Sequence, residues 1–122
     1  NIGRYVIDMR PNEVKYKAKP NADDKLILSE LNDIKARVTK AIDNYRFAQA
    51  AEELYDFVWH RFADKYVEAS KDRRSEAQPV LEQVLEESLR LLHPFMPMIT
   101  EEIWQKLPHK SGESIMISPW PK

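Results

Sequence analysis

The sequence predicts an all-α fold, an antiparallel bundle of four main helices with an extended C-terminal tail. Apolar side chains recur at alternating steps of three and four residues, which is the spacing of one face of an α-helix. Prolines stand where these periodic stretches stop, as at Pro94 and Pro108, and proline disfavours helical geometry in the residue before it. With 43% hydrophobic and 32% charged residues over 122 positions, the chain has the composition of one globular domain.

The first helix is predicted to begin after a polar, proline-flanked segment that ends at Pro20. Asn21 or Asp23 can cap it, and acidic side chains in its first turn favour the positive end of the helix dipole. Its apolar positions form a narrow stripe of the kind that packs in bundles. The members of the stripe are Ile27, Leu31, Ile34, Val38, Ala41 and Tyr45. We expect this stripe to face the core.

The second helix is predicted over residues 47–70. An α-helix turns by about 100° per residue. At this rotation, the apolar residues that share one face are Phe47, Ala51, Leu54 and Val58. Continuing this face places Arg61 and Lys65 where apolar side chains are expected, and such local conflicts concentrate at functional sites. Alternatively, both side chains extend past the end of the core, or pair with Asp64 and Glu68 three residues on.

A basic connection at residues 71–74 leads to a third helix, predicted over residues 76–93. Its inner side is expected to carry Leu81, Val84, Leu85, Ser88, Leu91 and Leu92. Pro79 lies close enough to the predicted start to be tolerated in the first turn. Pro94 ends the helix because it pushes the preceding residue out of helical geometry.

The fourth helix is predicted to start at Pro97 and to stop before Pro108. It is expected to bury Ile99, Ile103 and Trp104. The ring of His93 is expected to tie the end of the third helix at this corner. The tail over residues 114–121 is too short and too rich in proline for another helix, so we expect it to lie extended across the bundle with Trp120 as an anchor.

Composition and motifs exclude several kinds of chemistry. There is no cysteine, and the two glycines, Gly3 and Gly112, belong to no phosphate-binding loop. The three histidines, His60, His93 and His109, lack metal-ligand spacing. No apolar run approaches the roughly 20 residues that span a bilayer. We therefore predict no catalytic, cofactor-binding or metal-binding residue, no membrane association, and a reducing, cytoplasmic location.

Several segments together resemble one protein family. Residues 43–68 read DNYRFAQAAEELYDFVWHRFADKYVE, residues 91–104 read LLHPFMPMITEEIW, and residues 112–121 read GESIMISPWP. With residues 24–32 and 1–9, these segments resemble the anticodon-binding domain of valyl-tRNA synthetases over essentially the whole chain. Isoleucyl and leucyl relatives share the bundle, but the YRF corner and the PFMP run are similar to the valyl family.

This resemblance implies the domain organisation and the partners. Residues 1–20 are expected to lead in from a catalytic core that this chain lacks, and residues 21–122 to form the α-helical anticodon-binding bundle. The family's full-length enzyme attaches valine to tRNA(Val) using ATP with Mg, through catalytic and editing domains that are absent from this chain. The chain alone is expected to be a non-catalytic monomer, with the tRNA(Val) anticodon stem-loop and the enzyme's own catalytic domain as partners.

Recognition of an anticodon loop needs cations on phosphates, planar groups that stack on splayed bases, and polar groups that read base edges. The candidate tRNA-binding residues are Arg37, Lys40, Asn44, Arg46, Arg61, Lys65, Arg73 and Arg74. Each can equally be a solvated surface group. Two alternatives stay open, namely the equivalent bundle of an isoleucyl- or leucyl-tRNA synthetase and a helical protein-interaction module.

Overall fold

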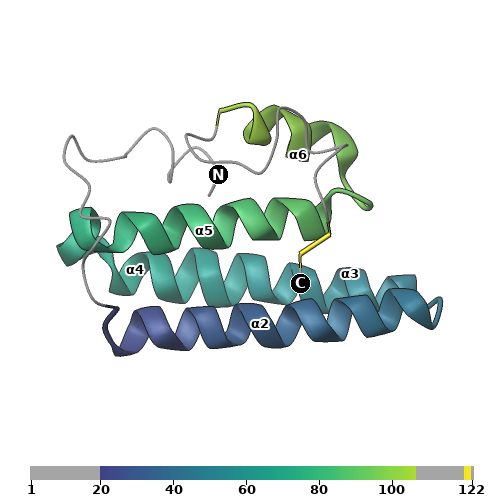
Figure 1. Cartoon of the computed structure of the whole chain (residues 1–122), viewed down its shortest axis with the longest axis horizontal. Helices are drawn as coiled ribbons and strands as arrows, with labels where there is room; N and C mark the ends of the chain where they lie inside the picture. The colour runs from purple at the N-terminus through teal and green to yellow at the C-terminus, as the bar shows by residue number, and fades with distance from the viewer. Residues whose placement is uncertain (1–19, 107–119, 122) are drawn as a thin grey trace.

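The computed structural model describes residues 20–106 and 120–121. All regular elements in this part are helical, and three long segments lie side by side in alternating directions, with a short helix packed against the last of them (Figure 1). They are α2 (Ala22–Asp43), α3 (Phe47–Asp56) continued by the π-helix η1 (Phe57–Tyr66) and by α4 (Val67–Ala69), the 3₁₀ turn η2 (Lys71–Arg73), α5 (Arg74–Leu92) and α6 (Pro97–Trp104). The predicted all-α bundle of four main helices is confirmed. The predictions for residues 1–19, for the stop at Pro108 and for the tail up to residue 119 fall outside the described residues.

Helix α2 begins and packs largely as its sequence pattern predicts. Asn21 is the N-cap: its side-chain oxygen accepts a hydrogen bond from the Asp24 backbone N–H (2.8 Å), and the Asp24 carboxylate accepts one from the Asn21 N–H (3.1 Å). This capping box satisfies two backbone donors at the helix start. The buried members of the predicted stripe are Ile27, Leu31, Ile34, Val38 and Ala41. The prediction that Tyr45 also faces the core is wrong, because α2 ends at Asp43 and Tyr45 is 83% exposed.

The second helical segment covers nearly the predicted range, but its buried face differs from the predicted one. Phe47 was expected inside and is instead 52% exposed, because it is the first residue of α3 and lies at the end of the bundle. Ala51 is only half-buried, whereas its neighbour Ala50 is fully buried. The buried side chains of the segment are Ala50, Leu54, Phe57, Val58, Phe62, Tyr66 and Val67.

The π-helix η1 explains why the α-helical pattern misplaced Arg61 and Lys65. Hydrogen bonds in a π-helix join residues i and i+5, so that each turn is wider than an α-helical turn. Side chains on one face are therefore spaced by four to five residues, as for the buried Phe57, Phe62 and Val67. Arg61 and Lys65 consequently lie on the exposed side. The conflict in the sequence pattern reflects a change of helical pitch and not charges in the core.

Helix α5 has the inner side that its sequence predicts. The predicted residues Leu81, Val84, Leu85, Ser88, Leu91 and Leu92 are all buried. The helix begins at Arg74, two residues before the predicted start, because the 3₁₀ turn η2 leads directly into it. Pro79 therefore lies inside the helix, beyond its first turn, which corrects the sequence prediction.

A buried ion pair joins α2 to α5. Lys35 Nζ lies 2.6 Å from Glu87 Oε1, and the Gln83 amide donates to the other Glu87 oxygen at 3.0 Å. Both charged residues are buried. A buried charge costs several kcal/mol unless it is paired, so this contact favours a single alignment of the two helices.

The corner between α5 and α6 is closed by a side-chain hydrogen bond. His93 Nδ1 lies 3.1 Å from the hydroxyl of the buried Thr100, which confirms that the His93 ring ties the helix end. Thr100 and Trp104, four residues apart, face the core and are both buried. Ile99 was expected inside and is 38% exposed, because it lies one step round the helix from that face. Ile103 is partly buried.

Candidate nucleic-acid interface

The turn between α2 and α3 holds an exposed aromatic residue in a strained backbone conformation. The Arg46 N–H donates to the Ala41 carbonyl (2.7 Å). The Tyr45 N–H donates to the Ile42 carbonyl (3.0 Å), and together the two bonds form a Schellman motif. This motif requires a residue in the left-handed region, and Tyr45 occupies it with a φ of 59°. Glycine is usual there because a Cβ costs about 1–2 kcal/mol in that region.

An apolar hollow of about 570 Å³ lies beside this turn. We call this hollow the corner pocket. Its walls consist of Thr39, Ile42, Asp43, Phe47, Pro94, Phe95 and Trp120. The Trp120 indole N–H donates to the Thr39 hydroxyl (2.7 Å), and this contact confirms Trp120 as an anchor on the bundle. The Tyr45 ring meets the Phe47 ring edge to face, with centroids 6.2 Å apart. The aromatic walls of the corner pocket are therefore joined, through Phe47, to the exposed ring of Tyr45.

A second hollow, of about 670 Å³, shares Thr39, Asp43 and Trp120 with the corner pocket. Its remaining walls are more polar and include Lys40 and Asn44. The Asn44 amide donates to the Lys40 carbonyl (2.8 Å), which fixes its orientation. The Lys40 ammonium and the Arg46 guanidinium are exposed and have no hydrogen bond or ion pair, judged over residues 20–106 and 120–121.

Arg37 lies one helical turn before Lys40 and contacts carboxylates. Its guanidinium is 3.2 Å from Asp33 and 4.0 Å from Glu53. It lines a groove of about 910 Å³ between α2 and the second helical segment. The acidic residues of this groove, Glu30, Asp33, Glu52, Glu53 and Asp56, outnumber its arginines, Arg37 and Arg61. A phosphate is repelled by such an excess of carboxylates, so Arg37 marks the boundary between an acidic groove and a basic turn.

The exposed side of η1 carries two more of the predicted residues. Arg61 lies 3.3 Å from Glu30 of α2. The Lys65 ammonium has no hydrogen bond or ion pair in the part of the chain that the structure describes. The intrahelical pairs considered from the sequence do not form, because Arg61 turns toward α2 and Glu68 pairs with Lys71 at 2.7 Å.

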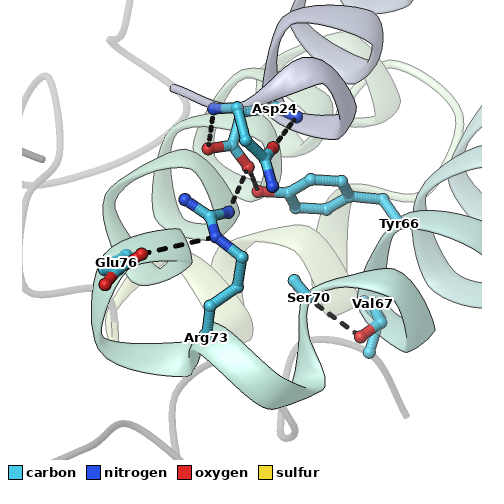
Figure 2. A network of polar contacts seen from close by, with 7 residues as sticks. Asp24, Tyr66, Val67, Ser70, Arg73 and Glu76 are labelled. Carbon is cyan, nitrogen blue, oxygen red and sulfur yellow. Dashed lines mark hydrogen bonds and ion pairs between the residues drawn. The ribbon is translucent and has the colours of Figure 1, made fainter. Parts of the chain in front are cut away.

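Arg73 is held in a polar network at the opposite end of the bundle (Figure 2). Its guanidinium donates to Asp24 (2.9 Å) and lies 3.5 Å from Glu76. The Tyr66 hydroxyl donates to the same Asp24 oxygen (2.6 Å). Asp24 is only 1% exposed, so the network joins the first turn of α2 to the end of η1 and the turn before α5. The neighbouring Arg74 donates to Gln78 at 2.8 Å.

Hydrogen bonds determine the protonation states in this network. Burial alone would raise the pKa of the Asp24 carboxyl, but donors from Tyr66, Arg73 and the Asn21 backbone outweigh burial and lower this pKa. Burial, followed by the bond to Asp24, raises the pKa of the Tyr66 hydroxyl. The bond to Asp24 raises the pKa of Arg73. At neutral pH Asp24 is therefore a carboxylate, Tyr66 a protonated phenol and Arg73 a charged guanidinium.

The eight predicted RNA-binding residues thus lie in separate regions. Lys40, Asn44 and Arg46 lie together at the α2–α3 turn, with Arg37 one turn away. Arg61 and Lys65 lie on η1, while Arg73 and Arg74 lie at the far end of the bundle, next to the start of α2 (Figure 1). Their contact with RNA stays a prediction.

Sequence reasoning missed the aromatic part of this surface. Tyr45 and Phe47 were assigned to the core because they continue apolar stripes. The only local signal against this was Asn44, a residue type that is favoured in turns. The position of Trp120 against Thr39 had no local signal, because the two residues are 81 positions apart.

Within residues 20–106 and 120–121, no group of three or more His, Cys, Asp or Glu side chains is arranged to hold a metal ion. Over the same residues, no helix combines the length and the apolar character needed to cross a membrane.

The architecture defines a helical-bundle module in which two exposed aromatic side chains, Tyr45 and Phe47, lie with two exposed cations, Lys40 and Arg46, at one interhelical turn. The chain belongs to the family described as the anticodon-binding domain of tRNA ligases, because the sequence profile of that family matches residues 24–122. The matched range includes α2, the turn after it and the later helices.

Curated relatives support the expected resemblance to the valyl family. The valine–tRNA ligase of Carboxydothermus hydrogenoformans is 45% identical over 133 residues, which cover 100% of this chain and 15% of the relative. That of Thermotoga maritima is 54% identical over 104 residues, 81% of this chain and 12% of the relative. That of Aquifex aeolicus is 38% identical over 145 residues, 100% of this chain and 12% of the relative. The chain thus spans only 12–15% of the length of these relatives.

Proposed function

We propose that this chain is the anticodon-binding domain of a valine–tRNA ligase and that it binds the anticodon stem-loop of tRNA(Val). The names of its relatives support valine over isoleucine or leucine. The observation that carries RNA binding is the α2–α3 turn, where unpartnered Lys40 and Arg46, judged over the described ranges, lie beside exposed Tyr45 and Phe47. Cations for phosphates and aromatic planes for splayed bases are the groups that bind single-stranded RNA.

The eight candidate residues differ in how far their side chains are already engaged. Lys40 and Arg46 come first because their charges are uncommitted among the described residues and lie at the turn that holds exposed Tyr45 and Phe47, and Asn44 supplies a polar group between them. Lys65 is also uncommitted among the described residues but lies away from this turn, so it ranks second. Arg37 and Arg61 follow, because each is paired with a carboxylate and lines the acidic groove. Arg73 and Arg74 rank last because their guanidinium groups are engaged by Asp24, Glu76 and Gln78.

We propose that this chain takes no part in the chemical step. ATP and Mg are proposed to serve the remainder of a full-length ligase, because the relatives are valine–tRNA ligases of which this chain spans only 12–15%. The role of the bundle is to hold the tRNA while a catalytic domain outside this chain acts on its other end. The proposed enzyme is a cytoplasmic monomer in which the bundle contacts its own catalytic domain.

Binding of the 122-residue chain to RNA hairpins tests the proposal. Fluorescence anisotropy compares a hairpin that carries the tRNA(Val) anticodon loop with hairpins altered at the second or third anticodon base. Each base-specific contact contributes about 1–3 kcal/mol, so we expect the altered hairpins to bind about 5- to 150-fold more weakly. Equal affinity for all hairpins contradicts base-specific readout, and no binding to any of them contradicts RNA binding.

The salt dependence of the same binding reaction tests the phosphate contacts. Each phosphate contact contributes about 0.7–0.9 to the slope of log affinity against log salt. We expect the variant Lys40→Ala/Arg46→Ala to lower this slope by about 1.5. Lys25→Ala is the matched control, because Lys25 is also exposed and without a partner in the described ranges but lies in the first turn of α2. Equal slopes for the double variant and the control contradict the assignment.

A further inference from the structure

The acidic groove between α2 and the second helical segment has room for a stretch of polypeptide. Its volume is about 910 Å³, and along α2 it extends from Leu26 to Arg37. At about 1.5 Å of rise per residue this length is roughly 16 Å, which is the length of about five residues of extended chain. Leu26 is 59% exposed and Tyr55 is 54% exposed at its sides, so an occupant of the groove covers apolar surface as well as charge.

The charges of the groove are unbalanced. Its five carboxylates and two arginines, with its histidine neutral, give a net charge of −3. Arg37 and Arg61 are each paired with a carboxylate of the groove. Glu52 and Asp56 are exposed and have no hydrogen bond or ion pair among residues 20–106 and 120–121. Within the same residues, the buried Oε2 of Glu53 accepts no hydrogen bond. A buried oxygen normally has a donor, so the groove favours an occupant that is cationic and carries N–H groups.

The aromatic side of the groove favours a guanidinium among the cations. Tyr55 and Asp56 follow Glu52 by three and four residues in α3, so the three side chains are neighbours on the helix surface. The Tyr55 ring stacks on the Trp59 ring, with centroids 4.4 Å apart and planes at 8°, so it is held in place before an occupant arrives. Arginine combines both contacts, because its planar guanidinium stacks on aromatic rings and donates two parallel hydrogen bonds to a carboxylate. The same carboxylates repel phosphate, which makes RNA an unsuitable occupant.

We propose that the acidic groove docks an arginine-bearing segment of the ligase polypeptide that lies outside these 122 residues. The chain spans only 12–15% of the length of its relatives. The remaining polypeptide is therefore tethered to the bundle and meets the groove at an effective concentration of about 1 mM. The guanidinium of the segment stacks on Tyr55 and donates to Glu52 or Asp56, and a further N–H donates to Glu53. This inference rests on the proposed function and adds the surface that holds the bundle against the rest of the enzyme.

Carboxylate footprinting of the full-length ligase, without RNA, tests the docked groove. A water-soluble carbodiimide with glycine ethyl ester labels accessible carboxylates, and mass spectrometry gives the rate at each one. Asp43 is the internal control, because it is exposed and without a partner in the described ranges, as Glu52 and Asp56 are, but lies at the end of α2. A contact with a dissociation constant of about 0.1 mM is closed about 90% of the time at about 1 mM. We therefore expect Glu52 and Asp56 to be labelled about tenfold more slowly than Asp43.

Two perturbations identify the occupant as a cation that stacks. Raising NaCl from about 0.1 to about 1 M shortens the screening length from about 10 to about 3 Å, so the rates of Glu52 and Asp56 should approach that of Asp43. Tyr55→Ala removes the stacking ring and should speed the labelling of both residues at low salt. Tyr45→Ala is the matched control, because it also deletes an exposed tyrosine ring but lies outside the groove, and it should leave both rates unchanged.

The outcomes separate this inference from the proposed function. Equal labelling of Glu52, Asp56 and Asp43 in the wild-type ligase shows an open groove and overturns the docking, while anticodon binding in the hairpin titrations stands. Slow labelling that neither salt nor Tyr55→Ala accelerates shows that the groove is covered by a segment of another kind, which overturns the arginine assignment. If wild type binds no hairpin, the proposed function fails, and the footprint still decides whether the groove is docked.

Discussion

Removing the Tyr66 hydroxyl tests the buried network around Asp24. The substitution Tyr66→Phe deletes a single O–H···O⁻ hydrogen bond of 2.6 Å and keeps the buried ring. Hydrogen bonds to charged groups contribute about 1.5–3 kcal/mol to stability. Asp24 keeps its donors from Arg73 and Asn21, so its charge is not left unpaired. We therefore expect the lower part of this range, a loss of about 1.5–2 kcal/mol from a total of about 5–15 kcal/mol.

Urea unfolding followed by circular dichroism measures the free energy of unfolding of Tyr66→Phe, Asp24→Asn and the double variant. The double-mutant cycle isolates the interaction of the two side chains, and we expect a coupling energy of about 1–2 kcal/mol. Tyr55→Phe is the control, because it removes a hydroxyl from an exposed tyrosine in the same helical segment. A coupling energy near zero, with Tyr66→Phe no more harmful than Tyr55→Phe, would refute the reasoning.

The pH dependence of the same cycle has a defined sign. The pKa of Asp24 in the folded state lies below its ordinary value of 3.8, so folding favours the carboxylate. Stability from this shift is complete above the ordinary pKa and is lost as the pH falls through the lowered pKa of the folded state. The difference in unfolding free energy between wild type and Asp24→Asn should therefore shrink as the pH falls from the ordinary pKa of 3.8 toward the lowered pKa of the folded state. A difference that stays constant down to about pH 2 contradicts an ionised Asp24.

Three further predictions concern the α2–α3 turn, the Lys35–Glu87 ion pair and the corner between α5 and α6. Tyr45→Gly should be about 1 kcal/mol more stable than Tyr45→Ala, because both lose the ring but only glycine lacks the Cβ that is strained at positive φ; equal melting temperatures contradict this. Lys35→Met should destabilise the bundle by about 3–5 kcal/mol by leaving Glu87 buried and unpaired, and Lys35→Met/Glu87→Leu should restore most of the loss; a double variant as unstable as the single one contradicts this. Thr100→Val removes the hydroxyl that meets His93 and should cost about 1 kcal/mol, which a thermal melt detects as a lower midpoint than that of wild type.

The elements with local signals could be predicted from the sequence. The cap at Asn21, the apolar stripe from Ile27 to Ala41, and the corner between Pro94 and Pro97 each depend on residues within one or two turns. The structure has all three where the sequence indicates them. The expected reason for the end of α5 is wrong, because His93 before Pro94 keeps helical dihedral angles (φ −51°, ψ −44°). The error at the start of α5 is two residues, because a 3₁₀ turn that leads into a helix has no strong sequence signature.

The features that depend on distant residues could not be predicted. Periodicity assumes one helical pitch, but η1 is a π-helix, which has wider turns than an α-helix, so the buried face was misassigned. Apolar spacing alone does not show where a helix ends, and Tyr45 was therefore placed inside. At the candidate site the charged residues were nominated from the sequence, but the engagement of Arg73 by Asp24, 49 positions away, is visible only in three dimensions.

The Asp24 network also has a consequence for how the domain folds. Its bonds join Asp24 to Tyr66 and Arg73 across 42 and 49 positions, whereas the packing of α2 on α3 closes a short turn. Closing the shorter loop loses less chain entropy, so the α2–α3 hairpin is expected to form first and the network after the main kinetic barrier. Interactions that form after the barrier leave the folding rate nearly unchanged and slow unfolding. The network thus acts on the lifetime of the folded bundle more than on the speed at which it assembles.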